Sequence, residues 1–509
     1  MSLSIVYTRA QLGVSAPLVT VEVHLANGLP GLSIVGLPEA TVKESKDRVR
    51  SAILNSGFEF PARKITVNLA PADLPKAGGR YDLAIGLGIL AASGQISTKS
   101  LELREFIGEL ALSGEVRPVS GIIPSVLACE ADKRALVLPS ANISEAELAG
   151  SLKLLPVVSL RTCCDLLQQG KVVRYHSSST FQDKMPLAVY PDFSEVSGQY
   201  QAKRAMEVAA AGGHHILLYG PPGTGKTMLA SRLPGILPQL DRQEALEVAA
   251  VHSVAGQFKT AEIWRQRPFR QPHHSASGAA LVGGGTVPRP GEISLAHQGV
   301  LFLDELPEFD RKVLEVMREP LESGEIVISR VSGSLSFPAR FQLVAAMNPC
   351  PCGYLGHPDI PCTDSTAQVE RYRNRLSGPL LDRFDLQIEV PAQQARVFTR
   401  PAEDVAEVDQ ETSVQIRGRV MKARERQSVR GKLNARLSGR ELERFCALDD
   451  VSVKMLELAV ARMRMSARGI HKVMRVSRTI ADLAGSEKVT QVHLSEALGY
   501  RKYERATSA

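Results

Sequence analysis

Residues 216–227 read Ile-Leu-Leu-Tyr-Gly-Pro-Pro-Gly-Thr-Gly-Lys-Thr, a short apolar run followed by a glycine-rich turn. The turn fits the pattern G-x-x-x-x-G-K-[ST] in full, and the helical run Met228–Leu233 follows it. Glycines let backbone N–H groups close around phosphates, and the positive end of the helix adds attraction. The pattern predicts a strand, a nucleotide-binding loop and a helix, rather than a chance glycine-rich turn. The predicted binding residues are Gly220, Pro221, Pro222, Gly223, Thr224, Gly225, Lys226 and Thr227.

A second apolar run, Val300–Leu303, ends in two carboxylates, Asp304 and Glu305, about 75 residues after the glycine-rich turn. A buried parallel strand presents its carboxyl end to the ligand crevice. We therefore expect Asp304 to hold Mg²⁺ together with the Thr227 hydroxyl, and Lys226 to reach the β- and γ-phosphates of ATP. Glu305 would polarise the attacking water, as a general base does. The alternative is an acidic loop after a core strand.

A third run, Leu343–Met347, ends in Asn348, which could orient the same water. These three strand ends resemble the Walker A, Walker B and sensor-1 elements of AAA+ ATPases. The segment 378–386, Gly-Pro-Leu-Leu-Asp-Arg-Phe-Asp-Leu, resembles the one that carries the arginine finger in the MCM and magnesium-chelatase branches, and Arg383 is the match. Arg468 resembles a sensor-2 arginine. A strand-end turn at Asn348 and surface salt bridges at the two arginines are the alternatives.

Four further motifs stand at Asp192–Gln199, Gln271–Ser277, Pro288–His297 and Arg475–Leu483. They resemble the magnesium-chelatase-like proteins of the ComM/YifB type, and the resemblance covers nearly the whole chain. It implies a bacterial DNA motor that uses ATP and Mg²⁺: a homo-oligomeric ring, most simply a hexamer, that acts as a branch-migration helicase on branched or single-stranded DNA. Homologous recombination and natural transformation are the implied processes.

Two other functions stay open. One is a chaperone-type motor, as in magnesium chelatase, where ATP drives a metal ion into a porphyrin; chelatase motor subunits are expected to lack the N-terminal domain described next. The other is a regulatory AAA+ protein that remodels protein partners. Stimulation of ATP hydrolysis by DNA would separate the helicase from both.

The chain divides by pattern into an α/β protein of several parts. Residues 1–175 alternate strands with helices predicted at 39–55 and 82–92; residues 176–191 are a polar linker; residues 192–395 alternate strands and helices as in an AAA+ parallel-sheet core. Residues 396–509 are predicted to form a helical lid, beginning with an acidic helix start at Pro401–Asp404.

The N-terminal domain resembles the Lon protease domain in the segments Leu74–Ile85 and Gly108–Gly121. Lon-type chemistry needs a serine activated by a lysine. Arg80, Tyr81 and Asp82 stand where the nucleophile would be, and the helix around Ser125 offers no lysine. The domain is therefore predicted to be a degenerate, non-proteolytic module for binding or ring formation.

Two stretches could contact DNA. Residues 326–337 have strand–turn–strand character and resemble the pre-sensor-1 hairpin of MCM-like motors, with Arg330 near the tip to grip a phosphate. The glycine-rich stretch Ser275–Gly291 resembles the helix-2 insert of the same motors. The basic run 417–440 is a second possible contact. An exposed arginine on a plain hairpin and a solvated helix face are the alternatives.

A short loop after Asn348 gathers Cys350, Cys352, His357 and Cys362. Three thiolates and an imidazole satisfy tetrahedral Zn²⁺, although Cys-x-Cys is tighter than a standard finger. A zinc site and a metal-free variable loop both remain open.

Composition sets the remaining limits. The chain has 509 residues, 44% of them hydrophobic, and a formal net charge of +7, which tolerates a polyanionic partner without requiring one. The first residues lack the pattern of a signal peptide, no apolar stretch suits a membrane, and seven cysteines in so long a chain do not form a disulfide framework. We expect a cytoplasmic protein.

Overall fold

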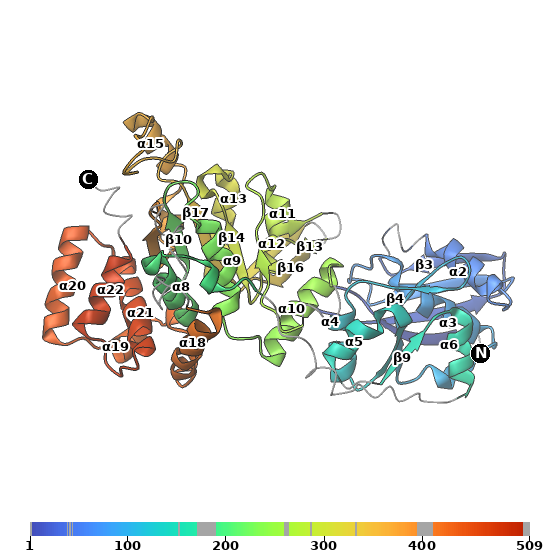
Figure 1. Ribbon diagram of the computed structural model, residues 1–509. Helices are drawn as coiled ribbons and strands as arrows, with labels where there is room; N and C mark the ends of the chain where they lie inside the picture. The colour runs from blue at the N-terminus through green and yellow to red at the C-terminus, as the bar shows by residue number, and fades with distance from the viewer. Residues whose placement is uncertain are drawn as a thin grey trace.

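The computed structural model describes residues 3–37, 39, 42, 44–150, 153–169, 190–258, 264–285, 288–330, 333–393 and 411–501. Figure 1 shows an N-terminal α/β region in blue and teal at one end, a central α/β region in green and yellow, and a helical C-terminal region in orange and red at the other end. Most of the predicted linker 176–191 and the predicted helix start Pro401–Asp404 lie outside the described residues.

The N-terminal region is built on a seven-stranded sheet in the order β3-β4-β2-β1-β5-β8-β9. The helix α3 (Asp82–Ala92) is buried along its whole length and packs on β1 and β2. A Cβ atom on Gly88 of α3 would lie 2.6 Å from Val23 Cγ2, so this close approach needs glycine. The strands are β1 (Leu3–Arg9), β2 (Leu18–Ala26), β3 (Gly31–Val35), β4 (Lys64–Ala70), β5 (Arg104–Phe106), β8 (Ala135–Pro139) and β9 (Leu154–Val157).

The other helices of this region are α2 (Ser45–Asn55), α4 (Ile122–Ala131), α5 (Ile143–Ala149) and α6 (Leu160–Gln169). The predicted helix 39–55 is confirmed from Ser45 to Asn55 as α2; Val42 is also helical, and residues 40, 41 and 43 lie outside the described part of the chain. The backbone N–H of Glu39 donates to the carbonyl of Lys76 at 3.0 Å, which ties this segment to the loop after β4.

The central region contains a five-stranded parallel sheet in the order β11-β14-β17-β10-β18. Its strands are β10 (Ile216–Tyr219), β11 (Phe269–Arg270), β14 (Val300–Leu303), β17 (Gln342–Met347) and β18 (Leu386–Glu389). Ile216 and Leu218 belong to the apolar core on one face, and Leu217 and Tyr219 to the core on the other. Both faces are therefore covered, as all-parallel sheets require, and the predicted parallel-sheet core is confirmed.

Helices from distant parts of the chain cover the sheet. α8 (Tyr200–Gly212) and α9 (Lys226–Ile236) share one core with the C-terminal helices, while α13 (Arg311–Val316), α16 (Gly378–Leu381) and the hairpin of β15 (Glu325–Arg330) and β16 (Gly333–Pro338) contribute to the other. Short elements complete the region: α11 (Gly278–Val282), β12 (Gly283–Gly284), β13 (Arg289–Pro290), α12 (Glu292–Leu295), α14 (Arg318–Ser323) and α15 (Thr366–Arg373).

The C-terminal region is helical, as predicted, within the described residues. Val473, Val476 and Ile480 recur at helical spacing along α21 and bury its inner face against α8 and α18. Its helices are α18 (Ser413–Ser428), α19 (Gly439–Phe445), α20 (Asp450–Met463), α21 (Ala467–Leu483) and α22 (Gln491–Gly499). None of the helices that the structure describes is both long enough and apolar enough to cross a bilayer.

The N-terminal and central regions share a hydrophobic core. It forms where α4 packs against α10 (Arg242–Ala255), between the two sheets in Figure 1. Val126 of α4 joins Val248 of α10 and Trp264 in one buried cluster. The N–H of Gly121 also donates to the carbonyl of Ser253 at 3.0 Å. The N-terminal region is therefore packed onto the central one as well as joined to it along the chain.

Candidate nucleotide site

The glycine-rich turn connects β10 to α9. Gly223 and Gly225 have φ angles of 76° and 87°, which side-chain-bearing residues rarely adopt. A Cβ atom on Gly220 would lie 2.2 Å from the carbonyl oxygen of Val390, so the backbone passes too close to β18 for any side chain. The helix begins at Lys226, and its free N–H groups face the loop. This is the local geometry that binds phosphate.

Lys226 reaches back into this loop. Its Nζ donates to the carbonyls of Gly220 and Pro221, both at 2.7 Å, and to Asn348 Oδ1 at 3.2 Å. Burial lowers the pKa of Lys226 to about 8, and the charge of Asp304 opposes that shift. The structure therefore brings together the predicted residues of the first and third strand ends around one ammonium group.

Thr227 and Asp304 also meet. The Thr227 hydroxyl donates to Asp304 Oδ2 at 2.8 Å, and Asp304 Oδ1 accepts the N–H of Glu305 at 3.0 Å. A hydroxyl and a carboxylate are hard oxygen donors of the kind that Mg²⁺ takes in phosphate sites. The donor set thus fits Mg²⁺ bound with a nucleotide, where the ion would neutralise phosphate charge.

Glu305 lies just beyond β14 in the left-handed conformation, with φ 51°. Its side chain is half exposed, and Oε2 lies 3.2 Å from Nδ1 of His274. Sequence reasoning did not single out His274, although it stands in the motif Gln271–Ser277. The two side chains are 31 positions apart, so only the fold brings them together.

Gln199 is another residue that sequence reasoning missed. Its side-chain amide donates to the carbonyls of Thr224 at 3.2 Å and Pro391 at 2.9 Å. It therefore ties the glycine-rich loop to the end of β18. The signal available was its place at the end of the motif Asp192–Gln199.

Arg383 lies at the opposite edge of the sheet. It immediately precedes β18, whose amino end pairs with the amino end of β10, whereas the glycine-rich loop follows the carboxyl end of β10. Four strand residues separate the two edges by about 13 Å. Arg383 forms an ion pair with Glu322, and its pKa is lowered by burial and by the charges of Arg468 and Arg318.

Arg468 shares this flank. It lies in the first turn of α21, and one turn further on Lys472 donates to the carbonyls of Asp382 and Phe384. The structure thus groups Arg468 with Arg383, and it groups Asp304 and Asn348 with Lys226. The six predicted catalytic residues form two clusters, one at each edge of the sheet.

The predicted hairpin is present as β15 and β16, an antiparallel pair in which Arg330 faces Gly333. Residues 331–332 and the Arg330 side chain lie outside the described part of the structure. The predicted insert Ser275–Gly291 contains α11 and the two-residue strands β12 and β13.

The basic run 417–440 is largely engaged within the chain. Arg419 forms ion pairs with Glu207 and Glu411, Arg424 donates to the carbonyl of Ala210, and Arg430 binds Asp482. These three arginines hold α18 and the turn after it in place, so part of the basic run serves packing within the chain.

The hydrogen bonds of Ser125 in the N-terminal region involve no lysine. Arg80 donates to Ser125 Oγ at 2.9 Å, and Ser125 Oγ donates to the carbonyl of Gly121 at 2.9 Å. Burial lowers the pKa of Arg80. A guanidinium donates hydrogen bonds and does not accept the proton of a nucleophile. The contact of Arg80 with Ser125 is structural.

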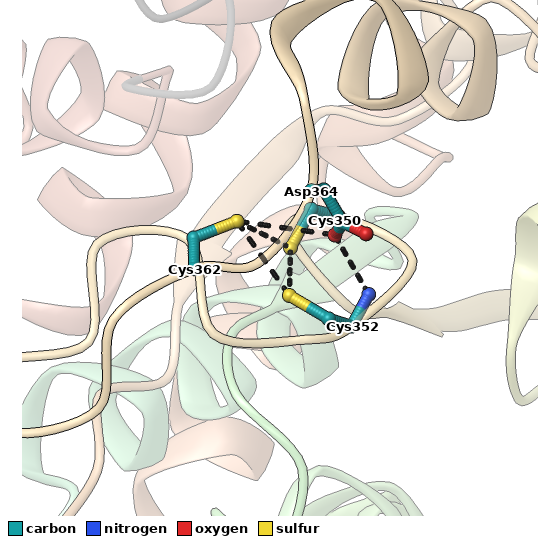
Figure 2. A group of neighbouring side chains, drawn as sticks. All are labelled: Cys350, Cys352, Cys362 and Asp364. Atoms are coloured by element: carbon teal, nitrogen blue, oxygen red, sulfur yellow. Dashed lines mark hydrogen bonds between the residues drawn. The ribbon is translucent and has the colours of Figure 1, made fainter.

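The structure brings the three predicted cysteines together, but the fourth residue of the group is Asp364 rather than His357. Cys350, Cys352 and Cys362 lie together with Asp364 (Figure 2). His357 instead accepts the N–H groups of Asp359 and Ile360 at its Nδ1 atom, at 3.1 and 3.0 Å. The predicted place of His357 in this group was therefore wrong, because its ring closes a turn of the loop.

Together, the five-stranded parallel sheet and the loop around Lys226 define a nucleotide-binding core of the AAA+ type. Residues 192–398 match a sequence model described as magnesium chelatase, subunit ChlI; residues 21–142 match one described as subunit ChlI of Mg-chelatase; and residues 410–501 match one for the ChlI C-terminal part.

Relatives that align over nearly their full length give the same family. The chain is 53% identical to the competence protein ComM of Haemophilus influenzae and 51% identical to YifB of Escherichia coli; each alignment covers 99% of this chain and 98% of the relative. It is 25% identical to the magnesium-chelatase 38 kDa subunit of Cereibacter sphaeroides, over 62% of this chain and 97% of that subunit. The chain belongs to the magnesium-chelatase-like ComM/YifB family.

Proposed function

We propose that this protein is an ATP-driven ring motor, most simply a hexamer, that moves branched or single-stranded DNA. Its activity would be that of a branch-migration helicase in homologous recombination and in natural transformation. The observation that carries the proposal is the similarity over nearly the full length to a protein named for competence, the capacity of a cell to take up DNA.

The site supports ATP hydrolysis as the energy source. Lys226 would hold the β- and γ-phosphates, and Thr227 and Asp304 would hold Mg²⁺. Glu305 would polarise the attacking water, with His274 holding its carboxylate and Asn348 orienting the water. The contacts around the carboxyl ends of β10, β14 and β17 support these proposed roles.

The distance between the two clusters supports a ring. Because Arg383 and Arg468 lie at the edge of the sheet away from Lys226, they would act on a nucleotide held by the neighbouring subunit. An arginine supplied in this way stabilises charge on the transferring phosphoryl group. Within the ring, residues 1–175 would be a Lon-like binding or ring-forming module, 192–395 the motor core and 396–509 the lid, joined by a linker at 176–191.

A protein-remodelling or metal-chelatase-type motor is the second candidate. It is favoured by the similarity to a magnesium-chelatase subunit. Residues 21–142 also match a model described as subunit ChlI, so an N-terminal region does not by itself exclude this candidate.

Hydrolysis of ATP by the purified full-length protein, with and without four-way DNA, separates the two. We expect four-way DNA to stimulate hydrolysis and the protein to dissociate the junction with ATP, and Glu305→Gln to abolish both. Matched concentrations of linear duplex serve as the control substrate. Hydrolysis that no DNA changes, with junctions left intact, would refute the DNA motor and favour the second candidate.

A further inference from the structure

The strongest feature outside the nucleotide site is the cysteine–aspartate group after β17. The Sγ atoms of Cys350, Cys352 and Cys362 lie 3.4, 3.5 and 3.6 Å from one another, and Cys362 Sγ lies 3.8 Å from Asp364 Oδ2 (Figure 2). All four ligand atoms lie within 4.8 Å of one another. Three sulfurs and one carboxylate oxygen thus stand at the corners of a small tetrahedron.

These separations suit a single metal ion. In tetrahedral zinc sites the Zn–S distance is about 2.3 Å, which places two ligand sulfurs about 3.8 Å apart, and a carboxylate oxygen about 3.5 Å from each sulfur. The three sulfur–sulfur separations and the distance from Cys362 Sγ to Asp364 Oδ2 differ from these values by a few tenths of an ångström, and the carboxylate of Asp364 lies within 4.8 Å of the other two sulfurs. A disulfide would need two sulfurs about 2.05 Å apart and would leave the third cysteine unpaired.

The ligand types favour zinc. Thiolates select soft or borderline ions, and a tetrahedral thiolate-rich set is typical of Zn²⁺, whereas the hard carboxylate disfavours Cu(I). Asp364 is already oriented, because its Oδ2 accepts the backbone N–H of Cys352 at 2.8 Å. Four protein ligands leave no open position, which is the pattern of a structural rather than a catalytic zinc site.

We propose that Cys350, Cys352, Cys362 and Asp364 bind one structural Zn²⁺ ion. The ion would join the end of β17 to the start of α15, because Cys350 follows Asn348 by two positions and Asp364 precedes the helix cap at Ser365.

The loop that the ion closes also touches the nucleotide site. A Cβ atom on Gly353 would lie 2.8 Å from Pro222 Cδ and 3.9 Å from Asn348 Cγ. The loop therefore packs directly on the glycine-rich turn. Zinc would fix this contact and, through it, the position at which Asn348 meets Lys226.

The zinc content of the purified protein tests this proposal independently of DNA binding and ATP turnover. The full-length protein, purified with a reductant and without chelators, should contain about one zinc per chain by elemental mass spectrometry. Cys362→Ser should reduce this to below about 0.1 per chain. His357→Ala, which alters the neighbouring residue outside the group, and Cys446→Ser, which alters a buried cysteine of the lid, should keep the full amount.

A second measurement covers the case in which Cys362→Ser does not fold. Co²⁺ exchanged into the wild-type protein should give the thiolate charge-transfer and visible bands of a tetrahedral site, and Asp364→Asn should shift them. Three results would overturn the proposal: wild-type protein that neither contains zinc nor takes up Zn²⁺ or Co²⁺; His357→Ala losing as much zinc as Cys362→Ser; or an intact mass lower by two hydrogens from a disulfide within the group.

Discussion

Glu305 and Lys226 differ in their surroundings. Lys226 is buried inside the glycine-rich loop, whereas Glu305 is half exposed beyond the next-but-one strand of the sheet. In the proposed function Lys226 would hold phosphates, and Glu305 would act on water that arrives from solvent. Their substitutions should therefore have different signatures.

Lys226→Ala should abolish productive ATP binding, while Glu305→Gln should keep binding and lower turnover by about 10² or more, the usual contribution of a general base. Nucleotide binding by fluorescence titration and turnover by phosphate release measure the two effects. Glu308→Gln, a nearby exposed carboxylate paired with Arg375, is the matched control. Near-normal turnover in Glu305→Gln would remove it from its assigned role.

The burial of Lys226 predicts that ATP binding is accompanied by proton uptake. Since its pKa is lowered to about 8, a fraction of this side chain is neutral in the free protein at pH 8 to 8.5. Bound phosphates favour the charged form, so ATP binding in that pH range should take up part of a proton. Calorimetry in buffers of different ionisation enthalpy measures this uptake. Equal heats in all buffers would contradict it.

Sequence predicted the residues whose spacing is local and missed those that the fold assembles. The loop residues 220–227 lie in one motif, so their grouping was predictable, and Asp304 and Asn348 followed from strand ends. His274 and Gln199 contact the nucleotide site through packing between distant segments, which spacing does not reveal. Asp364 was also missed, although it lies only two positions after Cys362. His357 was chosen for its chemistry, but its ring is used within its own turn.

At the scale of elements, the β15–β16 hairpin is connected to the site through β17. β16 ends at Pro338, and β17, which leads to Asn348, begins at Gln342. A change at the end of β17 is therefore separated from the hairpin by one strand and a short connection. Sequence predicted this hairpin because its strands are β-rich and flank a Ser-Gly turn.

Arg330→Ala should keep ATP binding and assembly but lose the stimulation of hydrolysis by DNA. Removing one phosphate contact weakens DNA binding about equally for all sequences and lowers the salt slope by roughly 1 per site. Binding measured across a salt series reports this slope. Lys454→Ala, on the exposed side of α20, is the matched control. Junction dissociation by Arg330→Ala at the wild-type rate would exclude the hairpin as a DNA contact.

At the scale of the whole molecule, Lys226 and Arg383 lie at opposite ends of the strands of the central sheet, so we expect them to cooperate between subunits. Arg383→Ala should lower turnover by about 10³ or more, the contribution of an arginine finger. Mixing Arg383→Ala with Lys226→Ala subunits should recover part of the activity, because some interfaces then combine an intact loop with an intact arginine. Co-assembly without recovery at any ratio would show that Arg383 does not act in trans.

The hydrophobic runs of the sequence predicted which segments form strands and helices, but they did not predict how the N-terminal and central regions pack on each other. Three strands of the central sheet, β10, β14 and β17, carry an apolar signal of their own, and the C-terminal helices carry helical spacing. The packing of α4 on α10 joins apolar positions more than a hundred residues apart, and each of those faces alone reads as an ordinary domain core.

That packing places the single tryptophan of the chain, Trp264, where the two regions meet, with only 4% of its surface exposed. The intrinsic fluorescence of Trp264 can therefore report on the interface between the N-terminal and central regions. α10 follows α9 after a short turn, and α9 starts at Lys226, so one continuous stretch runs from the phosphate-binding loop to this interface. The emission of Trp264 therefore reports whether the packing of α4 on α10 changes when nucleotide binds at the loop.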